Sequence, residues 1–118
     1  MRGSFLRFYV HENDRCHHQL VWEWLLQQAN ELGVRGGSAF KAMAGFGRHR
    51  TLVESRIFDL KGSQIIEVEF AVTDEEAQSL LNLLHREKIS LFYAYIPGRF
   101  GTLDGGRSDP TGAARLDR

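Results

Sequence analysis

The order in which alternating and helical patterns follow one another is the feature that most restricts the fold of this chain of 118 residues. Segments in which apolar and polar side chains alternate are typical of half-buried strands, and apolar side chains three and four residues apart are typical of amphipathic helices. Both patterns recur along the chain. We expect strands at residues 5–11, 38–46, 65–72 and 90–96 and helices at residues 16–32 and 74–86.

Strand, helix, strand, strand, helix, strand is the order of a ferredoxin-like α+β sandwich, in which two helices cover one face of a four-stranded sheet. Residues 54–60 suggest a further short strand, and the turn residues 61–64 follow it. Pro97-Gly98 is expected to end the last strand. The sequence therefore predicts a ferredoxin-like sandwich with an extra hairpin or loop between the second and third core strands.

Local signals mark the ends of the two helices. Asn13 or Asp14 can cap the first helix, and Gly33 stands where that helix is expected to end. Thr73 and Glu76 have the spacing of a capping box at the start of the second helix. These signals support the two helices that the apolar spacing predicts.

A sheet that is covered by helices on one face leaves its other face to water or to another subunit. Aromatic, apolar and charged side chains are expected to share this uncovered face. They are Arg7, Tyr9, Lys41, Met43, Glu67, Glu69, Tyr93 and Tyr95. The mixture suits a subunit interface better than a bare sheet, and the alternative is the polar face of a monomer.

Composition and charge argue against several classes of function. Fifteen basic residues balance fifteen acidic ones, so bulk attraction to nucleic acid or to a membrane surface is not expected. No apolar run approaches the roughly 20 residues that span a bilayer, and the chain begins without a signal-peptide pattern. Cys16 has no second cysteine to pair with and fits a reducing compartment. We therefore expect a cytoplasmic protein without a nucleic-acid partner and without membrane insertion.

The chain length corresponds to one domain. Residues 1–4 are treated as an N-terminal extension or a tag remnant, and residues 5–101 as the folded domain. From residue 102 to residue 118 large apolar side chains almost vanish. This tail is expected to be weakly ordered unless a partner holds it.

A glycine-rich turn followed by basic residues is the strongest candidate for a ligand site. The second strand closes with Gly45-Phe46-Gly47, and Arg48 and Arg50 follow directly. Glycine lets a ligand approach the backbone closely, and guanidinium groups suit phosphate and carboxylate because they offer bidentate donors. The sequence predicts an anion site at the root of a mobile loop. The alternative is that both arginines are solvated loop charges and that the glycines only shape the turn.

Three further motifs carry a family resemblance. They are Glu12-Asn13-Asp14-Arg15-Cys16-His17 after the first strand, Gly36-Gly37-Ser38-Ala39-Phe40 leading to Gly45-Phe46-Gly47-Arg48, and the segment from Phe92 to Pro97. Together with the order of elements, they resemble the PII signal-transduction superfamily. More closely, the chain is similar to the PII-like family catalogued as domain of unknown function 190. The resemblance covers most of the chain.

This resemblance implies a homotrimer of ferredoxin-like subunits with ligand clefts between neighbours. It also implies a flexible loop, here residues 48–53, that reports the ligand state to a partner protein. The expected ligand is a small anion, with a nucleotide as the best single candidate. The residues expected to hold it are Gly45, Phe46, Gly47, Arg48, Arg50 and Arg99.

Two departures from the well-studied PII proteins argue against ATP and 2-oxoglutarate sensing of the usual kind. The connection between the second helix and the last strand is Glu87-Lys88-Ile89, which lacks the glycines that cradle nucleotide phosphates in those proteins. His49 stands where they carry a glutamine associated with metal and 2-oxoglutarate binding. The phosphates of a bound nucleotide would need other donors, such as Arg48, Arg50 and Arg99.

His11, Cys16 and His17 form a second cluster that could carry chemistry. Imidazole and thiolate are good ligands for zinc or copper, but the spacing matches no established metal pattern. We expect a capping and packing role, with no bound metal and no cofactor. A cysteine beside a histidine in the sequence is not thereby in hydrogen-bond geometry, and no oxyanion-binding feature accompanies it, so an enzyme is not expected.

The sequence as a whole predicts a PII-like trimeric regulatory protein that binds a small anionic ligand between subunits and acts on a partner protein. Two alternatives stay open. One is a metal-binding trimer that uses the cluster of His11, Cys16 and His17, and the other is a structural assembly protein without a ligand.

Overall fold

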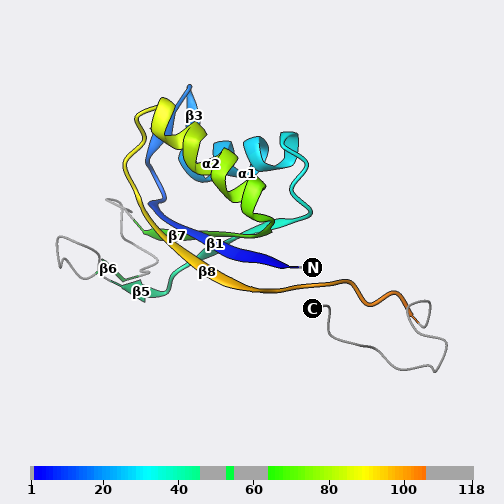
Figure 1. Ribbon diagram of the computed structural model, residues 1–118. Helices are drawn as coiled ribbons and strands as arrows, with labels where there is room; N and C mark the ends of the chain where they lie inside the picture. Colours follow the sequence, from blue (N-terminus) through cyan, green and yellow to red (C-terminus); the bar gives the residue numbers. More distant parts are fainter. Residues whose placement is uncertain (1, 46–52, 55–63, 106–118) are drawn as a thin grey trace.

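A four-stranded antiparallel sheet with two helices on one face forms the body of the protein (Figure 1). The computed structural model describes residues 2–45, 53–54 and 64–105, and the strands lie in the order β4-β7-β1-β8. The elements of the body are β1 (Arg2–His11), α1 (Val21–Glu31), β4 (Gly37–Lys41), β7 (Ile65–Val72), α2 (Asp74–Arg86) and β8 (Phe92–Arg99). This is the predicted ferredoxin-like α+β sandwich, and the predicted fold class is confirmed.

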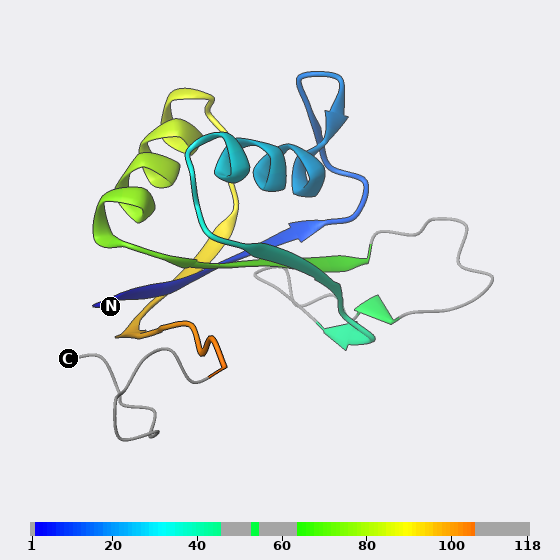
Figure 2. The ribbon, with the colours of Figure 1, turned by 90° about the vertical axis from the view of Figure 1, so that its right-hand side faces the viewer.

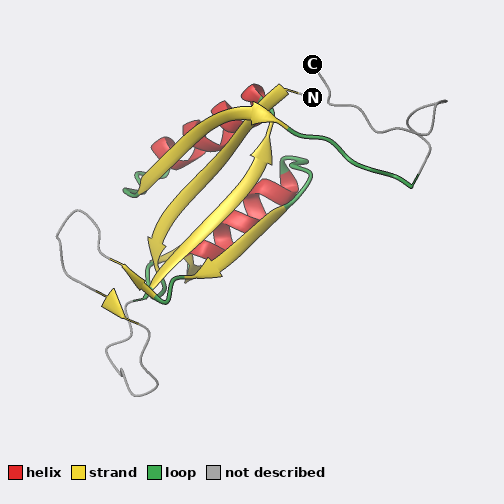
Figure 3. Cartoon of the chain, turned by 90° about the horizontal axis from the view of Figure 1, so that it is seen from below, coloured by secondary structure: helices red, strands yellow, loops and turns green. Residues whose placement is uncertain are grey.

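Two small antiparallel ladders extend this body. β2 (Arg15–Cys16) pairs with β3 (Gln19–Leu20) in the connection before α1, and β5 (Ala44–Gly45) pairs with β6 (Val53–Glu54) between β4 and β7. The second ladder occupies the place of the predicted extra hairpin. Figure 3 shows it beyond one end of the four-stranded sheet, while β1 starts at the other end.

The hydrophobic core lies between the sheet and the two helices, which share one side of the sheet (Figure 2). Residues that face each other on β1 and β7, such as Leu6 and Phe70 or Phe8 and Val68, are buried beneath the helices. The rings of Phe8 and Phe70 meet edge to face at a centroid distance of 6.2 Å.

Within the described residues, neither helix is long and apolar enough to cross a membrane.

The second helix begins with the predicted capping box. The side chain of Thr73 accepts a hydrogen bond from the N–H of Glu76, and the carboxylate of Glu76 accepts one from the N–H of Thr73 at 2.8 Å. At the end of α1, Gly33 has a φ angle of +84°, which a glycine adopts without strain. The predicted start of α2 and the predicted end of α1 are therefore confirmed.

The first helix begins at Val21, later than predicted. His17 and His18 have φ angles of 49° and 64°, in the left-handed region, and so cannot belong to a right-handed helix. They form the two-residue turn of the β2–β3 hairpin, a position that requires positive φ in the common turn types. The predicted helical pattern from residue 16 was wrong over this hairpin.

Neither Asn13 nor Asp14 caps the first helix. The residue at the N-cap position is Leu20, and no side-chain cap bond is formed there. Asp14 contributes through its main chain, because its carbonyl accepts a hydrogen bond from the N–H of Val21 at 2.8 Å. The hairpin turn, not a polar side chain, positions the start of this helix.

Three strand ends differ from the prediction by three residues or more. β1 begins at Arg2, β4 ends at Lys41, and β8 continues through Pro97 and Gly98 to Arg99. Pro97 does not end β8 because β8 is an edge strand, where the missing N–H of a proline is tolerated. The sheet therefore extends further toward its β1 start than the sequence suggests.

The register places both tyrosines of β8 on the helix side of the sheet, which corrects the prediction. Tyr93 lies opposite Phe8 and Tyr95 lies opposite Leu6, and both partners are core residues. The hydroxyl of Tyr95 donates a hydrogen bond of 2.6 Å to Oδ1 of Asp74, the first residue of α2. Apolar side chains occur at both alternating positions of β8, so its sequence does not decide which face is buried.

Lys41 is likewise on the helix side, since it lies opposite the buried Ile66. Its Nζ forms an ion pair of 3.2 Å with Glu12.

We call the helix-free surface of the sheet the open face. The register assigns to it Phe5, Arg7, Tyr9, Ser38, Phe40, Glu67, Glu69, Phe92, Ala94 and Ile96.

A pair of glycine substitutions tests the packing of β4 on the core. A Cβ added to Gly37 would lie 2.4 Å from a ring carbon of Phe70, which is buried, whereas a Cβ on Gly36 would meet nothing within 4 Å. We expect Gly37→Ala to lower the free energy of unfolding by about 1–3 kcal/mol through overpacking. Gly36→Ala should leave it unchanged or raise it slightly. Urea denaturation of both variants measures the difference, and equal stability would contradict the packing described.

Candidate functional site

The predicted anion site lies partly within the described residues. Gly45 belongs to β5, and Arg99 is the last residue of β8. The other predicted ligand residues fall outside the described part of the chain. They are Phe46, Gly47, Arg48 and Arg50.

Gly45 forms the base of the segment 46–52. It pairs with Val53 in the β5–β6 ladder, so the two ends of this segment meet. A Cβ on Gly45 would lie 3.1 Å from Cδ1 of Ile65, so the glycine allows close contact with the first residue of β7. The N–H of Ala42 also donates to the carbonyl of Ile65 at 2.8 Å. These contacts attach the base of the predicted loop to one end of the sheet.

Arg99 stands at the other end of the sheet. His11 lies opposite Ile65 in the β1–β7 register, and Arg2 lies opposite Arg99 in the β1–β8 register. The 10 residues of β1 separate these two ends. At about 3.3 Å per residue, the separation is roughly 30 Å. One subunit therefore cannot bring Gly45 and Arg99 to the same small ligand.

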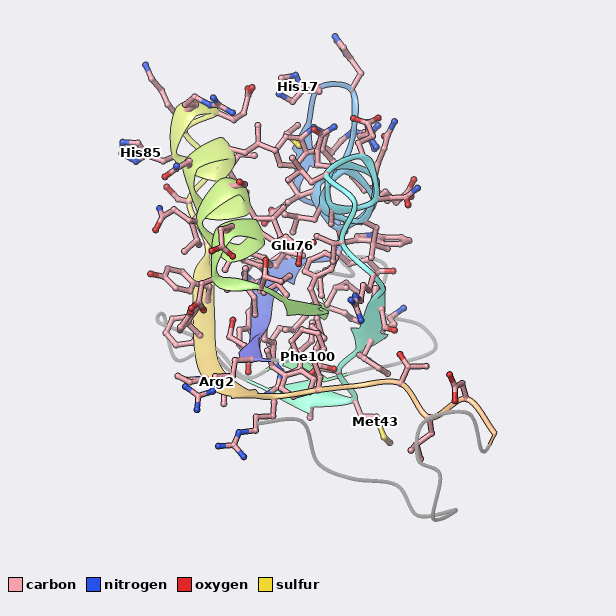
Figure 4. All side chains as sticks on the ribbon, turned by 45° about the vertical axis from the view of Figure 1, so that its right-hand side comes forward. Arg2, His17, Met43, Glu76, His85 and Phe100 are labelled. Carbon is pink, nitrogen blue, oxygen red and sulfur yellow. The ribbon has the colours of Figure 1, made fainter. Side chains whose placement is uncertain are left out.

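Arg2 is a candidate site residue that the sequence did not indicate. It lies directly opposite Arg99 on the helix side of the sheet, and both arginines line a surface pocket of about 450 Å³. Figure 4 shows Arg2 and Phe100 at this end of the molecule, far from His17 and His85. Arg2 lies in the segment 1–4, which was predicted to be an extension and instead contains the start of β1. Apolar alternation does not mark this start of β1, because the helix-side positions before Leu6 are the polar Ser4 and Arg2.

The predicted histidine and cysteine cluster does not assemble as a metal site. Nε2 of His17 lies 2.8 Å from Oε2 of Glu87, just after α2, and its ring stacks on Trp24 at a centroid distance of 5.7 Å. Cys16 is half-buried in β2, and His11 ends β1. No three His, Cys, Asp or Glu side chains in the described ranges come together in a group that could hold a metal ion. His17 instead joins the β2–β3 hairpin to the end of α2.

The environment of Cys16 also disfavours thiolate chemistry. Burial raises the pKa of the Cys16 thiol above its ordinary value, and the charge of Glu87 raises it further. The thiolate is the form that attacks substrates and binds metals. At neutral pH this thiol stays protonated, which fits a packing role.

The open face carries both aromatic and paired charged side chains. Phe92 is 70 % exposed and Phe40 is 51 % exposed, and the ring of Tyr9 lies 5.5 Å from that of Phe92. Nη2 of Arg7 lies 2.6 Å from Oε1 of Glu69, and this hydrogen bond raises the pKa of Arg7 above its ordinary value. The face thus combines exposed aromatic side chains with one ion pair and with the carboxylate of Glu67, which forms no ion pair with a described residue.

The antiparallel ferredoxin-like sandwich, with its additional ladder after β4, is the fold of solved PII-like proteins. The chain belongs to the family of domain of unknown function 190, described as uncharacterized ACR, which matches residues 3–89. It is also 28 % identical over 103 residues to the UPF0166 protein of Aquifex aeolicus strain VF5, and the match covers 87 % of each chain. The family resemblance predicted from the motifs is confirmed.

Solved structures show the same fold. A protein of Thermus thermophilus described as PII-like and signaling matches with a TM-score of 0.56 and 17 % identity, over 83 % of this chain and 86 % of that chain. CPII of Thiomonas intermedia K12, bound to ADP and bicarbonate, matches with a TM-score of 0.53 and 20 % identity, over 83 % and 89 %. A second CPII structure, described as a nitrogen regulatory PII-like protein bound to ADP, AMP and bicarbonate, gives a TM-score of 0.52.

The raised pKa of Cys16 leads to a test of its reactivity. We expect iodoacetamide to modify Cys16 more slowly in the folded protein at pH 8 than in the urea-unfolded chain, because the folded thiol holds less thiolate. Glu87→Gln should accelerate the reaction, and Glu75→Gln, at the other end of α2, should not. Mass spectrometry gives the rates. A folded protein that reacts as fast as the unfolded chain would reopen the thiolate and metal alternatives.

Proposed function

We propose that this protein is a PII-like homotrimeric regulatory protein that binds a small anionic ligand between subunits and signals through the loop after Gly47 to a partner protein. A nucleotide is the best single candidate for the ligand. The observation that carries the proposal is the open face, a sheet surface with exposed aromatic side chains and no covering helix among the described residues. Regulation without catalysis and a cytoplasmic location belong to the same proposal.

The composition of the open face supports assembly through it. Exposed Phe92, Tyr9 beside it and Ile96, which is 42 % exposed, form the kind of apolar surface that subunit interfaces bury. Arg7 and Glu69 already satisfy each other, so burying this face would leave neither of these two charges unpaired, whereas the carboxylate of Glu67 would need a donor from the neighbouring subunit. Closed cyclic symmetry allows three copies to cover one another without leaving an open sheet surface.

The positions of Gly45 and Arg99 support a ligand site between subunits. They lie at opposite ends of one sheet, so a small ligand that contacts both must take them from two chains. The binding of ADP and bicarbonate by CPII supports a nucleotide or another small anion as the ligand. Binding would order the loop, and a difference in partner affinity between the ordered and unordered forms would carry the signal.

The open face equally favours a second candidate function, a structural assembly protein without a ligand. This candidate shares the trimer with the first and lacks only the anion site. Ligand binding therefore distinguishes the two functions, whereas the oligomeric state does not.

The first test concerns assembly. We expect light scattering to give the mass of a trimer at micromolar concentration, and Phe92→Asp to shift the protein toward the monomer because it places a charge on the open face. Leu103→Asp is the matched control, since Leu103 is 78 % exposed and follows β8 outside the sheet. A wild-type protein that stays monomeric across micromolar concentrations would refute the proposed assembly.

The second test concerns the ligand. Calorimetry with nucleotides and with phosphorylated or carboxylated metabolites should find a ligand that binds more tightly than about millimolar. Arg48→Ala should weaken its binding by about 1.5–3 kcal/mol, the usual scale for a hydrogen bond to a charged group. Arg35→Ala, which removes an exposed arginine before β4, should leave it unchanged. If no such ligand binds, the protein is better described as a structural assembly protein.

A further inference from the structure

Two arginines meet at the end of the sheet where β1 starts and β8 finishes. Arg2 and Arg99 are direct cross-strand partners and point to the helix side of the sheet. Both line the pocket of about 450 Å³ introduced above, which also borders the first residue of α2. The pocket is lined by the backbone of two opposed glycines, Gly3 and Gly98. A volume of this size holds a phosphoryl group and several waters, which take about 30 Å³ each in the liquid.

The two guanidinium groups are charged neighbours without a counterion in the described part of the chain. Like charges directly opposite on a sheet destabilise it. The guanidinium groups of Arg2 and Arg99 form no hydrogen bond or ion pair with a described residue. Other basic side chains behave differently, since Arg7 pairs with Glu69 and Lys41 pairs with Glu12. An anion between the two arginines would remove the repulsion.

One carboxylate borders the pocket, and it is already engaged. Asp74 accepts the hydrogen bond of 2.6 Å from the hydroxyl of Tyr95, which raises the pKa of Tyr95 above its ordinary value. Among the described residues, Asp74 forms no ion pair with Arg2 or Arg99. The N-terminus of α2 adds positive potential on the same side of the sheet. The pocket therefore keeps a net positive charge from its lining side chains.

We infer that Arg2 and Arg99 form an oxyanion pocket that binds a phosphoryl group within a single subunit. Each guanidinium presents a planar pair of donors. A tetrahedral phosphate has separate edges for two such forks, whereas a carboxylate has one, so phosphate is the better match. This inference goes beyond the proposed function, because it assigns Arg2, gives Arg99 a partner in its own subunit, and requires neither the loop nor a second subunit.

Free inorganic phosphate and the phosphoryl end of a nucleotide share this chemistry. The first experiment uses inorganic phosphate alone and follows the amide signals of Gly3 and Gly98 by NMR in the full chain, at ionic strength matched with sodium chloride. We expect saturable shifts in the wild type. Arg2→Gln and Arg99→Gln should each weaken the binding by at least about tenfold.

Two further variants separate the pocket from general charge effects. Arg86→Gln removes the same charge at the far end of α2 and should bind phosphate like the wild type. Arg2→Lys keeps the charge but loses the bidentate fork, so it should bind with an affinity between those of the wild type and Arg2→Gln. Sodium acetate should shift the same amides only at higher concentrations.

The second experiment compares ADP with adenosine by calorimetry in the same variants. If Arg2→Gln and Arg99→Gln weaken ADP at least about tenfold and leave adenosine unaffected, the phosphoryl group reaches the pocket as part of a nucleotide, and the inference stands. If phosphate binds but no nucleotide does, the inference stands and the nucleotide proposal fails. If neither phosphate nor ADP depends on Arg2, the inference is wrong, whatever Arg48→Ala does to the ligand.

Discussion

The pairing of β1 with β7 is the constraint on which the rest of the structure depends. Its register puts Leu6 and Phe8 beneath the helices and Arg7 on the open face. A slip by one residue would turn every side chain of the strand to the other face, so that Arg7 would enter the core. The same register aligns Arg7 with Glu69, whose ion pair therefore forms in the correct pairing only. The burial of apolar side chains in the core and the ion pair on the open face therefore favour the same register of β1 on β7.

The sequence signals are unambiguous where one face of a strand or helix is buried and the other is exposed to solvent. The central strands and the capping box of α2 have such unambiguous signals. The signals were misleading for β8, whose aromatic side chains occupy both alternating positions, and for the β2–β3 hairpin. In this hairpin the predicted helix ran across two histidines that adopt positive φ, a conformation that the residue type histidine does not indicate.

The residue types of the anion site stay a prediction, whereas the fold determines the geometry of its described residues. Glycines followed by arginines indicate an anion, and the motifs identified the family that the comparison confirms. The distance between Gly45 and Arg99 follows from the directions of the strands. β4 and β8 run in opposite directions, so the last residues of these two strands lie at opposite ends of the sheet. Sequence motifs contain no information about such distances. Gly45 and Arg99, which were predicted to share one site, therefore lie near opposite ends of β1.

The distribution of charge bears on how such a protein can select an anion. The chain has a formal net charge of zero, so no long-range field draws anions toward it, and polyanions such as nucleic acid gain little from proximity. Ion pairs such as Arg7 with Glu69 further cancel charge locally. Selectivity must then come from short-range donors in fixed positions. Arginines that the fold brings together without a counterion among the described residues, such as Arg2 and Arg99, meet this requirement because their forks recognise the shape of the anion as well as its charge. In the proposed oxyanion pocket, strand register rather than net charge would therefore determine the ligand chemistry.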